Sequence, residues 1–134
     1  MIIVDSTVWV DLLGGVSNPH TQWLEHAIPL KRIGLTDLIL CEVLQGVREE
    51  NLSNEVRREL TKFSLFRIAG EELAVGAAQN YRRLRTLGYT VRKTIDCLIA
   101  TFCLVEGHSL LHRDRGFDPF EKLLGLAVIH PENA

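Results

Sequence analysis

Four acidic residues stand in apolar surroundings, where burying an isolated carboxylate is costly. Asp5 ends the apolar run Ile2–Val4, and Asp114 follows the apolar stretch "SLLHR". Glu42 lies inside "LILCEVL" and Asp96 near the start of "TIDCLIATFCLV". Carboxylates brought together repel one another, and a hard divalent cation neutralises them. Because the set offers oxygen donors only, it favours Mg²⁺ or Mn²⁺ over zinc. These residues, called the four acids below, are Asp5, Glu42, Asp96 and Asp114.

Each of the four acids also has a purely structural interpretation. Asp5 and Asp114 are suited to cap helices, since an Asp side chain accepts hydrogen bonds from the free N–H groups of a first turn. Asp96 would complement the helix dipole just behind an N-cap at Thr94. Glu42 is the hardest to explain in this way, because its apolar neighbours leave little polar face. From the residues alone, both interpretations stay open.

Short apolar runs alternate with longer amphipathic stretches along the chain, a pattern typical of βαβ units with a parallel sheet. We predict one domain over residues 1–134 with a three-layer α/β/α sandwich and a short parallel sheet. The predicted strands are 2–4, 32–36, 65–69, 109–112 and 126–131. The predicted helices are 7–13, 19–28, 37–46, 51–63, 71–87 and 94–106, with a helical turn at 120–124.

This architecture brings the four acids toward one edge. In a parallel sheet the carboxyl ends of the strands and the starts of the following helices lie on the same side. Asp5, Asp96 and Asp114 therefore converge there. Glu42 sits about one turn into its helix, and its side chain can reach back toward that edge.

Composition describes an ordinary globular chain. It has 134 residues, 46% hydrophobic and 24% charged, with a net charge of −2 that gives no global attraction to nucleic acid. Neither a secretory signal nor a membrane-spanning stretch is expected. The cysteines Cys41, Cys97 and Cys103 show no zinc or disulfide spacing, so we expect packed thiols in a reducing cytoplasm.

One segment departs from this balanced charge. The stretch from Tyr81 to Lys93 holds five basic residues and no acidic residue, and it is called the basic run below. It is either a solvated helix face followed by a turn or a footprint for phosphates. Its basic members are Arg82, Arg83, Arg85, Arg92 and Lys93.

The sequence resembles the PIN-domain family, specifically the VapC-type toxins of toxin–antitoxin pairs. The segments that carry the resemblance are "IIVDSTVWVDLL", "CEVLQG", "LRTLGYTVRKTIDCLIATFCLVEG" and "LLHRDRGFDPF". The resemblance implies a PIN-like fold and a metal-dependent ribonuclease, usually dimeric and held inactive by a cognate antitoxin. The four acids fall on the family's acidic positions and Ser6 on its small hydroxyl position, with Asp118 as a further acid. Cys97 and residues 101–103 depart from the family's small residues, which concerns packing and not the acids.

The predicted chemistry is phosphodiester hydrolysis in RNA by the four acids with Mg²⁺ or Mn²⁺. Asp5 and Asp96 are the expected direct ligands, and Asp114 would bind directly or through water. Glu42 would orient or deprotonate the attacking water. Ser6 would hydrogen-bond a ligand carboxylate or a phosphate oxygen, and the basic run would engage the RNA backbone.

Three other functions remain as alternatives. A receiver-like, Mg²⁺-binding phospho-accepting domain would have paired acids after its first strand, where Ser6 and Thr7 follow Asp5, and a Lys at a late strand end, whereas Lys122 lies in a predicted helix. A haloacid-dehalogenase-type phosphatase would have an Asp at position 7. An interaction module would use its acids only as caps, which Glu42 argues against.

Overall fold

A sheet of four parallel strands in the order β3-β2-β1-β4 forms the centre of the molecule. The computed structural model describes residues 1–131, and the last three residues of the predicted domain lie outside this range. In the sheet, Ile2 pairs with Ile33 on one side and with Ser109 on the other. The strands are β1 (Ile2–Val4), β2 (Ile33–Thr36), β3 (Ser64–Phe66) and β4 (Ser109–Leu111). The apolar run that opens the chain is thus a central strand.

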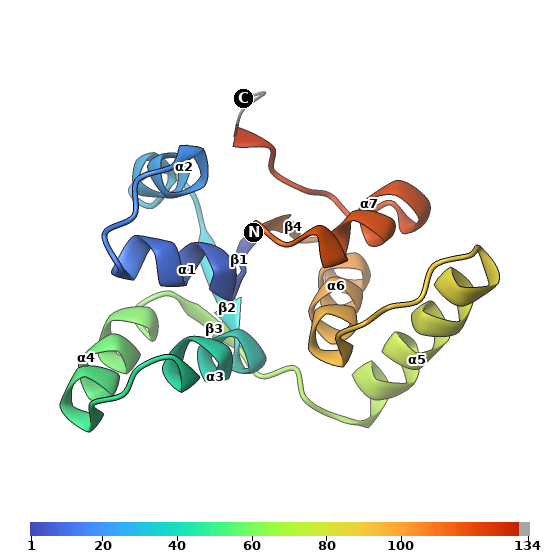
Figure 1. Ribbon diagram of the computed structural model, residues 1–134, viewed down its shortest axis with the longest axis horizontal. Helices are drawn as coiled ribbons and strands as arrows, with labels where there is room; N and C mark the ends of the chain where they lie inside the picture. The colour runs from blue at the N-terminus through green and yellow to red at the C-terminus, as the bar shows by residue number, and fades with distance from the viewer. Residues whose placement is uncertain (132–134) are drawn as a thin grey trace.

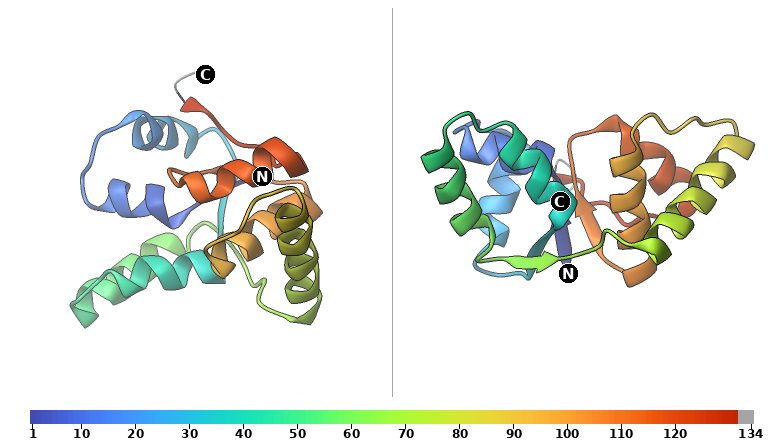
Figure 2. Two further views of the ribbon diagram at one scale, coloured as in Figure 1. Left: turned by 45° about the vertical axis from the view of Figure 1, so that its right-hand side comes forward. Right: turned by 90° about the horizontal axis from the view of Figure 1, so that it is seen from below.

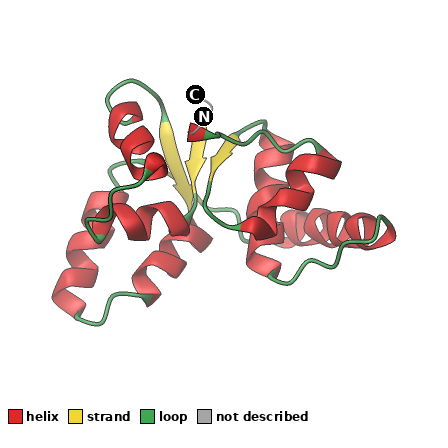
Figure 3. Ribbon diagram, turned by 45° about the horizontal axis from the view of Figure 1, so that its top comes forward, coloured by secondary structure: helices red, strands yellow, loops and turns green. Residues whose placement is uncertain are grey.

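Two groups of helices enclose this sheet (Figures 1 and 3). One group contains α1 (Ser6–Leu13), α2 (Pro19–Ala27), α3 (Asp37–Gln45) and α4 (Glu50–Leu60). The other contains α5 (Glu71–Thr86), α6 (Thr94–Glu106) and α7 (Asp118–Leu124), with the 3₁₀ turn η1 (Arg115–Phe117). Figure 2 shows the same division from two further sides. The predicted α/β sandwich is therefore confirmed.

The core fills both sides of the sheet with apolar side chains. Trp9 of α1 is buried and packs on Phe63 with ring centroids 5.1 Å apart. On the other side α6 is the most buried helix, as its nearly unbroken apolar sequence predicts. Small residues let α5 approach it closely, and the Cys97 thiol donates to the Ala77 carbonyl at 3.2 Å. This packing fixes the starts of α1 and α6, which carry two of the four acids.

The predicted strand at 126–131 is wrong. Only Val128 forms a bridge, opposite Leu110, supported by backbone hydrogen bonds on either side. Leu126 is the single buried residue of this segment, so little apolar surface holds it to the sheet. Pro131 also lacks the N–H that would extend the ladder. The predicted strand at 65–69 is shorter and begins one residue earlier, as β3.

The prediction that Cys41 is a packed thiol is also wrong, whereas Cys97 and Cys103 are buried. The helical period explains the difference. Cys41 lies two residues from both Ile39 and Val43, which face the core, so it points to the opposite side of α3.

Candidate active site

The carboxyl edge of the sheet carries the four acids. Asp5 directly follows β1, and its N–H donates to the carbonyl of Leu111 at the end of β4. Asp114 follows the same strand, and Asp96 lies in the first turn of α6. The pKa of Asp96 responds to the charges of the other three acids, as well as to its own burial. The structure thus brings the four acids into one electrostatic environment.

Asp5 uses one of its two carboxylate oxygens as a cap. It is the N-cap of α1, and Oδ2 accepts the N–H of Thr7 at 3.2 Å and its hydroxyl at 2.7 Å. The Thr7 hydroxyl in turn accepts the N–H of Arg113 at 3.1 Å, which ties α1 to the chain after β4. The other oxygen, Oδ1, is buried and has no hydrogen-bond partner within residues 1–131. Burial raises the pKa of this carboxyl above its ordinary value. The capping role of Asp5 therefore leaves its second oxygen open to a ligand.

Asp96 does not act as a side-chain cap. Lys93, not Thr94, is the N-cap of α6, and its side chain makes no capping hydrogen bond. Asp96 is only 4% exposed, and its Oδ2 has no partner among the described residues. Burial, with the charges of Asp114 and Asp5, raises the pKa of Asp96 from 3.8 to about 7. The carboxylate is therefore held where it is electrostatically disfavoured.

The other two acids are engaged by neighbouring side chains. The Ser6 hydroxyl donates to Oε1 of half-buried Glu42 at 3.1 Å, and burial and the charge of Asp5 raise the pKa of Glu42. Oδ2 of Asp114 accepts the Lys93 ammonium at 2.9 Å, and Oδ1 accepts the N–H of Gly116 at 2.8 Å. Burial alone would raise the pKa of Asp114, but the Lys93 and Gly116 hydrogen bonds bring it below its ordinary value.

A hard cation fits this edge through its open oxygens. Within residues 1–131 no three His, Cys, Asp or Glu side chains form a ready-made metal-binding group. Asp5 and Asp96, however, each have one buried oxygen without a hydrogen-bond partner among the described residues. An unsatisfied buried carboxylate oxygen is costly, and a divalent cation that prefers oxygen donors would satisfy both. The donor chemistry therefore fits Mg²⁺ or Mn²⁺.

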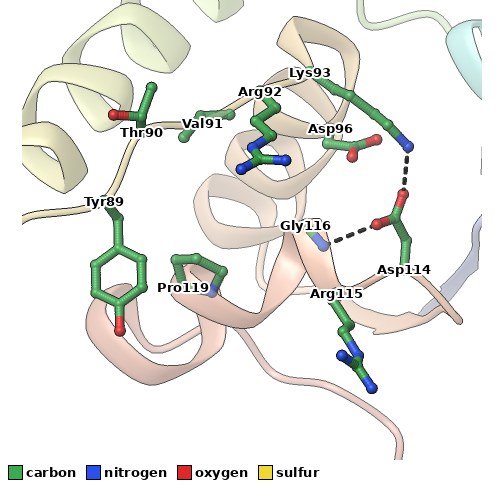
Figure 4. A pocket seen from close by; sticks show the side chains of 10 residues that line it. All are labelled: Tyr89, Thr90, Val91, Arg92, Lys93, Asp96, Asp114, Arg115, Gly116 and Pro119. Carbon is green, nitrogen blue, oxygen red and sulfur yellow. Dashed lines mark hydrogen bonds and ion pairs between the residues drawn. The ribbon is translucent and has the colours of Figure 1, made fainter.

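A pocket of about 400 Å³ opens beside Asp96 and Asp114 (Figure 4). Of the basic run, only Arg92 and Lys93 line it. Arg82, Arg83 and Arg85 are exposed on α5, and the Arg85 guanidinium lies 5.5 Å from the centre of the Tyr81 ring. The structure thus divides the basic run into a part at the site and a part on α5.

Asp118 does not line this pocket. It begins α7, and its charge acts on buried His112. A role for Asp118 in metal binding stays a prediction.

Three further residues support the site and were not identified from the sequence. The Thr7 hydroxyl links Asp5 to the backbone of Arg113. The sequence contained a signal for this role, because Thr7 places a hydroxyl two residues after Asp5. His112 accepts the N–H of Asp114 on Nδ1 at 3.0 Å and packs on Phe117. A methyl group on Gly116 would lie 3.0 Å from Oδ2 of Asp96 and 3.2 Å from Oδ1 of Asp114. No sequence signal marks such a close approach.

Comparison with known proteins decides the family. The family model of the PIN domain matches residues 2–123. The chain belongs to the PIN-domain family. The resemblance inferred from the sequence is confirmed, and the receiver-like alternative is not favoured.

Individual relatives agree with this assignment. The PIN-domain chain is 29% identical over 131 residues to "VapC ribonuclease Mb1587" of Mycobacterium bovis, covering 94% of this chain and 96% of the relative. The crystal structure of VapBC2 from Rickettsia felis, bound to a promoter DNA fragment, has a TM-score of 0.76 at 15% identity, covering 96% and 98% of the two chains. A toxin-antitoxin complex from Klebsiella pneumoniae has a TM-score of 0.73 at 17% identity, covering 98% of each. These structures share the fold.

Across residues 1–131, no helix combines the length and apolarity that crossing a bilayer requires.

Proposed function

We propose that this PIN-domain protein is a metal-dependent endoribonuclease and the toxin of a toxin–antitoxin pair. The observation that carries the proposal is the pair of buried, unpartnered oxygens on Asp5 and Asp96, beside a pocket lined by basic side chains. The relative named a VapC ribonuclease supports the activity. The similar fold in a toxin-antitoxin complex supports the biological role.

Each of the four acids has a defined part in this proposal. Asp5 and Asp96 would hold the cation through their open oxygens, and Asp114 would add a further oxygen directly or through water. When bound, Mg²⁺ or Mn²⁺ neutralises charge on the reacting phosphate and lowers the pKa of water. Glu42 would orient the attacking water and accept its proton, while the hydrogen bond from Ser6 fixes the position of the Glu42 carboxylate.

The basic residues nearest the four acids bind the RNA backbone. Arg92 and Arg115 line the pocket with Lys93, and all three are exposed. Their positive charge offsets the repulsion between the carboxylates and the phosphates of the substrate. The arginines on α5 extend the same positive surface away from the site.

We further propose that a cognate antitoxin covers an apolar groove between α1, α3 and α4. This groove, of about 430 Å³, is lined by Val10, Leu13 and Leu52, each about half exposed. Apolar antitoxin side chains would fill it, and an antitoxin Arg or Lys would insert among the four acids and displace the cation. Copurification of a fully active, metal-loaded complex would contradict this arrangement.

We also propose that the protein forms a homodimer and acts in the cytoplasm.

Cleavage of RNA by purified variants tests the activity. Asp5→Asn and Asp96→Asn should each lose cleavage in Mn²⁺ and keep the fold, because an amide is a poorer ligand for a hard cation. A labelled single-stranded RNA, followed on a denaturing gel, gives the rate, and circular dichroism checks the fold.

Asp37→Asn is the matched control for these variants. Asp37 lies at the same sheet edge, but its Oδ1 accepts the N–H groups of Leu38 and Ile68, a role that an amide oxygen can keep. This control should retain cleavage. Cleavage by a folded Asp5→Asn or Asp96→Asn protein would place the catalytic site elsewhere.

A further inference from the structure

The pocket beside the four acids has two chemically different ends. Asp96 and Asp114 stand at one end, with Lys93 paired to Asp114 (Figure 4). Tyr89 stands at the other end, and Pro119 lies between (Figure 4). The Tyr89 side chain is 45% exposed although it is aromatic. An aromatic ring is thus presented within one cavity of the acidic edge.

The cations of the pocket differ in their availability. Lys93 is engaged by Asp114, whereas Arg92 and Arg115 have no ion-pair partner in the part of the chain that is described. A guanidinium binds a phosphate through two parallel N–H donors. The two arginines are therefore free to hold an anion in the pocket.

An exposed aromatic ring beside free arginines suits one nucleotide of a single strand. Bases stack on aromatic side chains irrespective of their identity, while cations follow the backbone. In a duplex the bases are stacked and paired, so only an unpaired base can reach such a ring. The volume of about 400 Å³ lies within the range of small-ligand pockets.

We infer that this pocket binds the nucleotide next to the scissile phosphate of single-stranded RNA, with its base on Tyr89 and its phosphate on Arg92 and Arg115. The inference rests on the proposed ribonuclease function, which it deepens by naming the subsite and the residues that form it. The direction follows from charge. The carboxylates at the Asp96 end repel a phosphate that no cation bridges, so the neutral base occupies the Tyr89 end. The backbone then runs from the arginines toward the four acids.

Binding of mononucleotides tests this subsite without any cleavage. The probes are uridine and adenosine 5′-monophosphate, and ribose 5-phosphate serves as the base-free control. Each is titrated into ¹⁵N-labelled protein, in chelator and in Mg²⁺, and amide shifts give the site and the dissociation constant. Wild type should bind the nucleotides more tightly than ribose 5-phosphate, with shifts confined to residues 89–93 and 114–119.

Three variants separate the base from the phosphate. Tyr89→Ala should weaken nucleotide binding roughly tenfold and leave ribose 5-phosphate binding unchanged, because it removes stacking only. Arg92→Gln should weaken both classes of ligand. Leu87→Ala is the matched control, since Leu87 lies with Tyr89 on the connection between α5 and α6, is 51% exposed and does not line the pocket. It should bind like wild type.

Clear results would overturn the inference. Equal affinity of wild type for nucleotides and ribose 5-phosphate, unchanged binding by Tyr89→Ala, shifts elsewhere, or absence of binding in both conditions would each contradict it. Failure of the ribonuclease proposal looks different, because RNA would stay intact in Mn²⁺ while nucleotides still bound the pocket.

Discussion

At the scale of single residues, the environment separates Asp114 from Asp5 and Asp96. Asp114 has a cationic partner in Lys93, and its pKa falls below the ordinary value. Asp5 and Asp96 are buried with one open oxygen each, and the pKa of each is raised. A raised pKa means that the charged carboxylate destabilises the metal-free fold. The residues best placed to hold a cation are thus those that gain most from one.

The contribution of Asp96 to the stability of the metal-free protein should therefore fall as pH rises. The pKa of Asp96 is about 7 in the folded chain, and its ordinary value is 3.8. The favourable contribution of Asp96 to stability is therefore complete below pH 3.8 and is lost as pH rises through about 7. Asp96→Asn should melt higher than wild type at about pH 8 in chelator, and the gain should shrink on acidification and vanish only below the ordinary value of 3.8. A gain of about 1 kcal/mol corresponds to roughly 4 °C for a chain of this size. Thermal melts followed by circular dichroism measure it.

Excess Mg²⁺ provides the second arm of this comparison. Wild type should be stabilised by Mg²⁺ and Asp96→Asn much less, because only binding to the native state raises the melting temperature. If Asp96 acted merely at the helix dipole, the variant would melt no higher than wild type in chelator and both would respond equally to Mg²⁺. That result would contradict the proposed electrostatic repulsion between Asp96 and the other acids.

At the scale of elements, the turn η1 sets the spacing of two acids. The N–H of Gly116 holds Asp114, while the space beside its Cα is filled by the carboxylates of Asp96 and Asp114. The start of α6 and the turn after β4 thus meet so closely that a Cβ at position 116 would force the neighbouring carboxylates to shift.

Gly116→Ala should therefore impair the site more than the fold. Its new methyl group would force the carboxylates of Asp96 and Asp114 to shift by a few tenths of an ångström. Even small displacements of catalytic groups slow a reaction, and a displacement of about 1 Å costs up to roughly 100-fold in rate. We expect at least a tenfold loss of RNA cleavage in Mn²⁺, with a melting temperature close to that of wild type. Gly76→Ala on α5 is the control, since its methyl group would lie at an ordinary 3.5 Å from Thr101. Full activity of a folded Gly116→Ala protein would contradict this role.

The elements also show which features a sequence can predict. Strands β1 and β4 and helix α6 were predictable because continuous apolar runs have one stable solution, burial on both sides. The meeting of Asp5, Asp96 and Asp114 followed from the common direction of parallel strands. Individual contacts between residues far apart in the sequence could not be predicted in this way. Thr7 and Arg113 are 106 residues apart in sequence, and nothing in the sequence pairs Lys93 with Asp114.

At the scale of the whole molecule, charge is unevenly distributed although the net charge is only −2. The acids gather at the carboxyl edge of the sheet, and the basic residues Arg92, Lys93 and Arg115 line the pocket next to it. Three further arginines are exposed on α5: Arg82, Arg83 and Arg85. Under the proposed function, such a surface would attract RNA locally without a general affinity for nucleic acid.

The salt dependence of RNA binding measures this surface. Removing one cation that binds a phosphate should lower the slope of log affinity against log salt by about 0.7 for a single strand. Arg82→Gln, Arg85→Gln and Arg92→Gln together should therefore weaken binding and flatten the slope. Fluorescence anisotropy with labelled RNA, in an Asp5→Asn background that leaves RNA intact, gives the slope. Arg92→Gln alone shows how much of the slope comes from the pocket. An unchanged slope in the triple variant would mean that the basic run is only a solvated face.

The most direct test of the central claim is the return of activity when metal is restored. A fluorophore–quencher RNA reports cleavage continuously while Mn²⁺ is added to protein freed of metal by chelator and dialysis. We predict no cleavage before addition and a saturable rise afterwards, because Asp5 and Asp96 need a cation to complete the site. Cleavage that is as fast in chelator as in Mn²⁺, or that never appears at saturating Mn²⁺, would contradict the assignment of this edge as a metal-dependent nuclease centre.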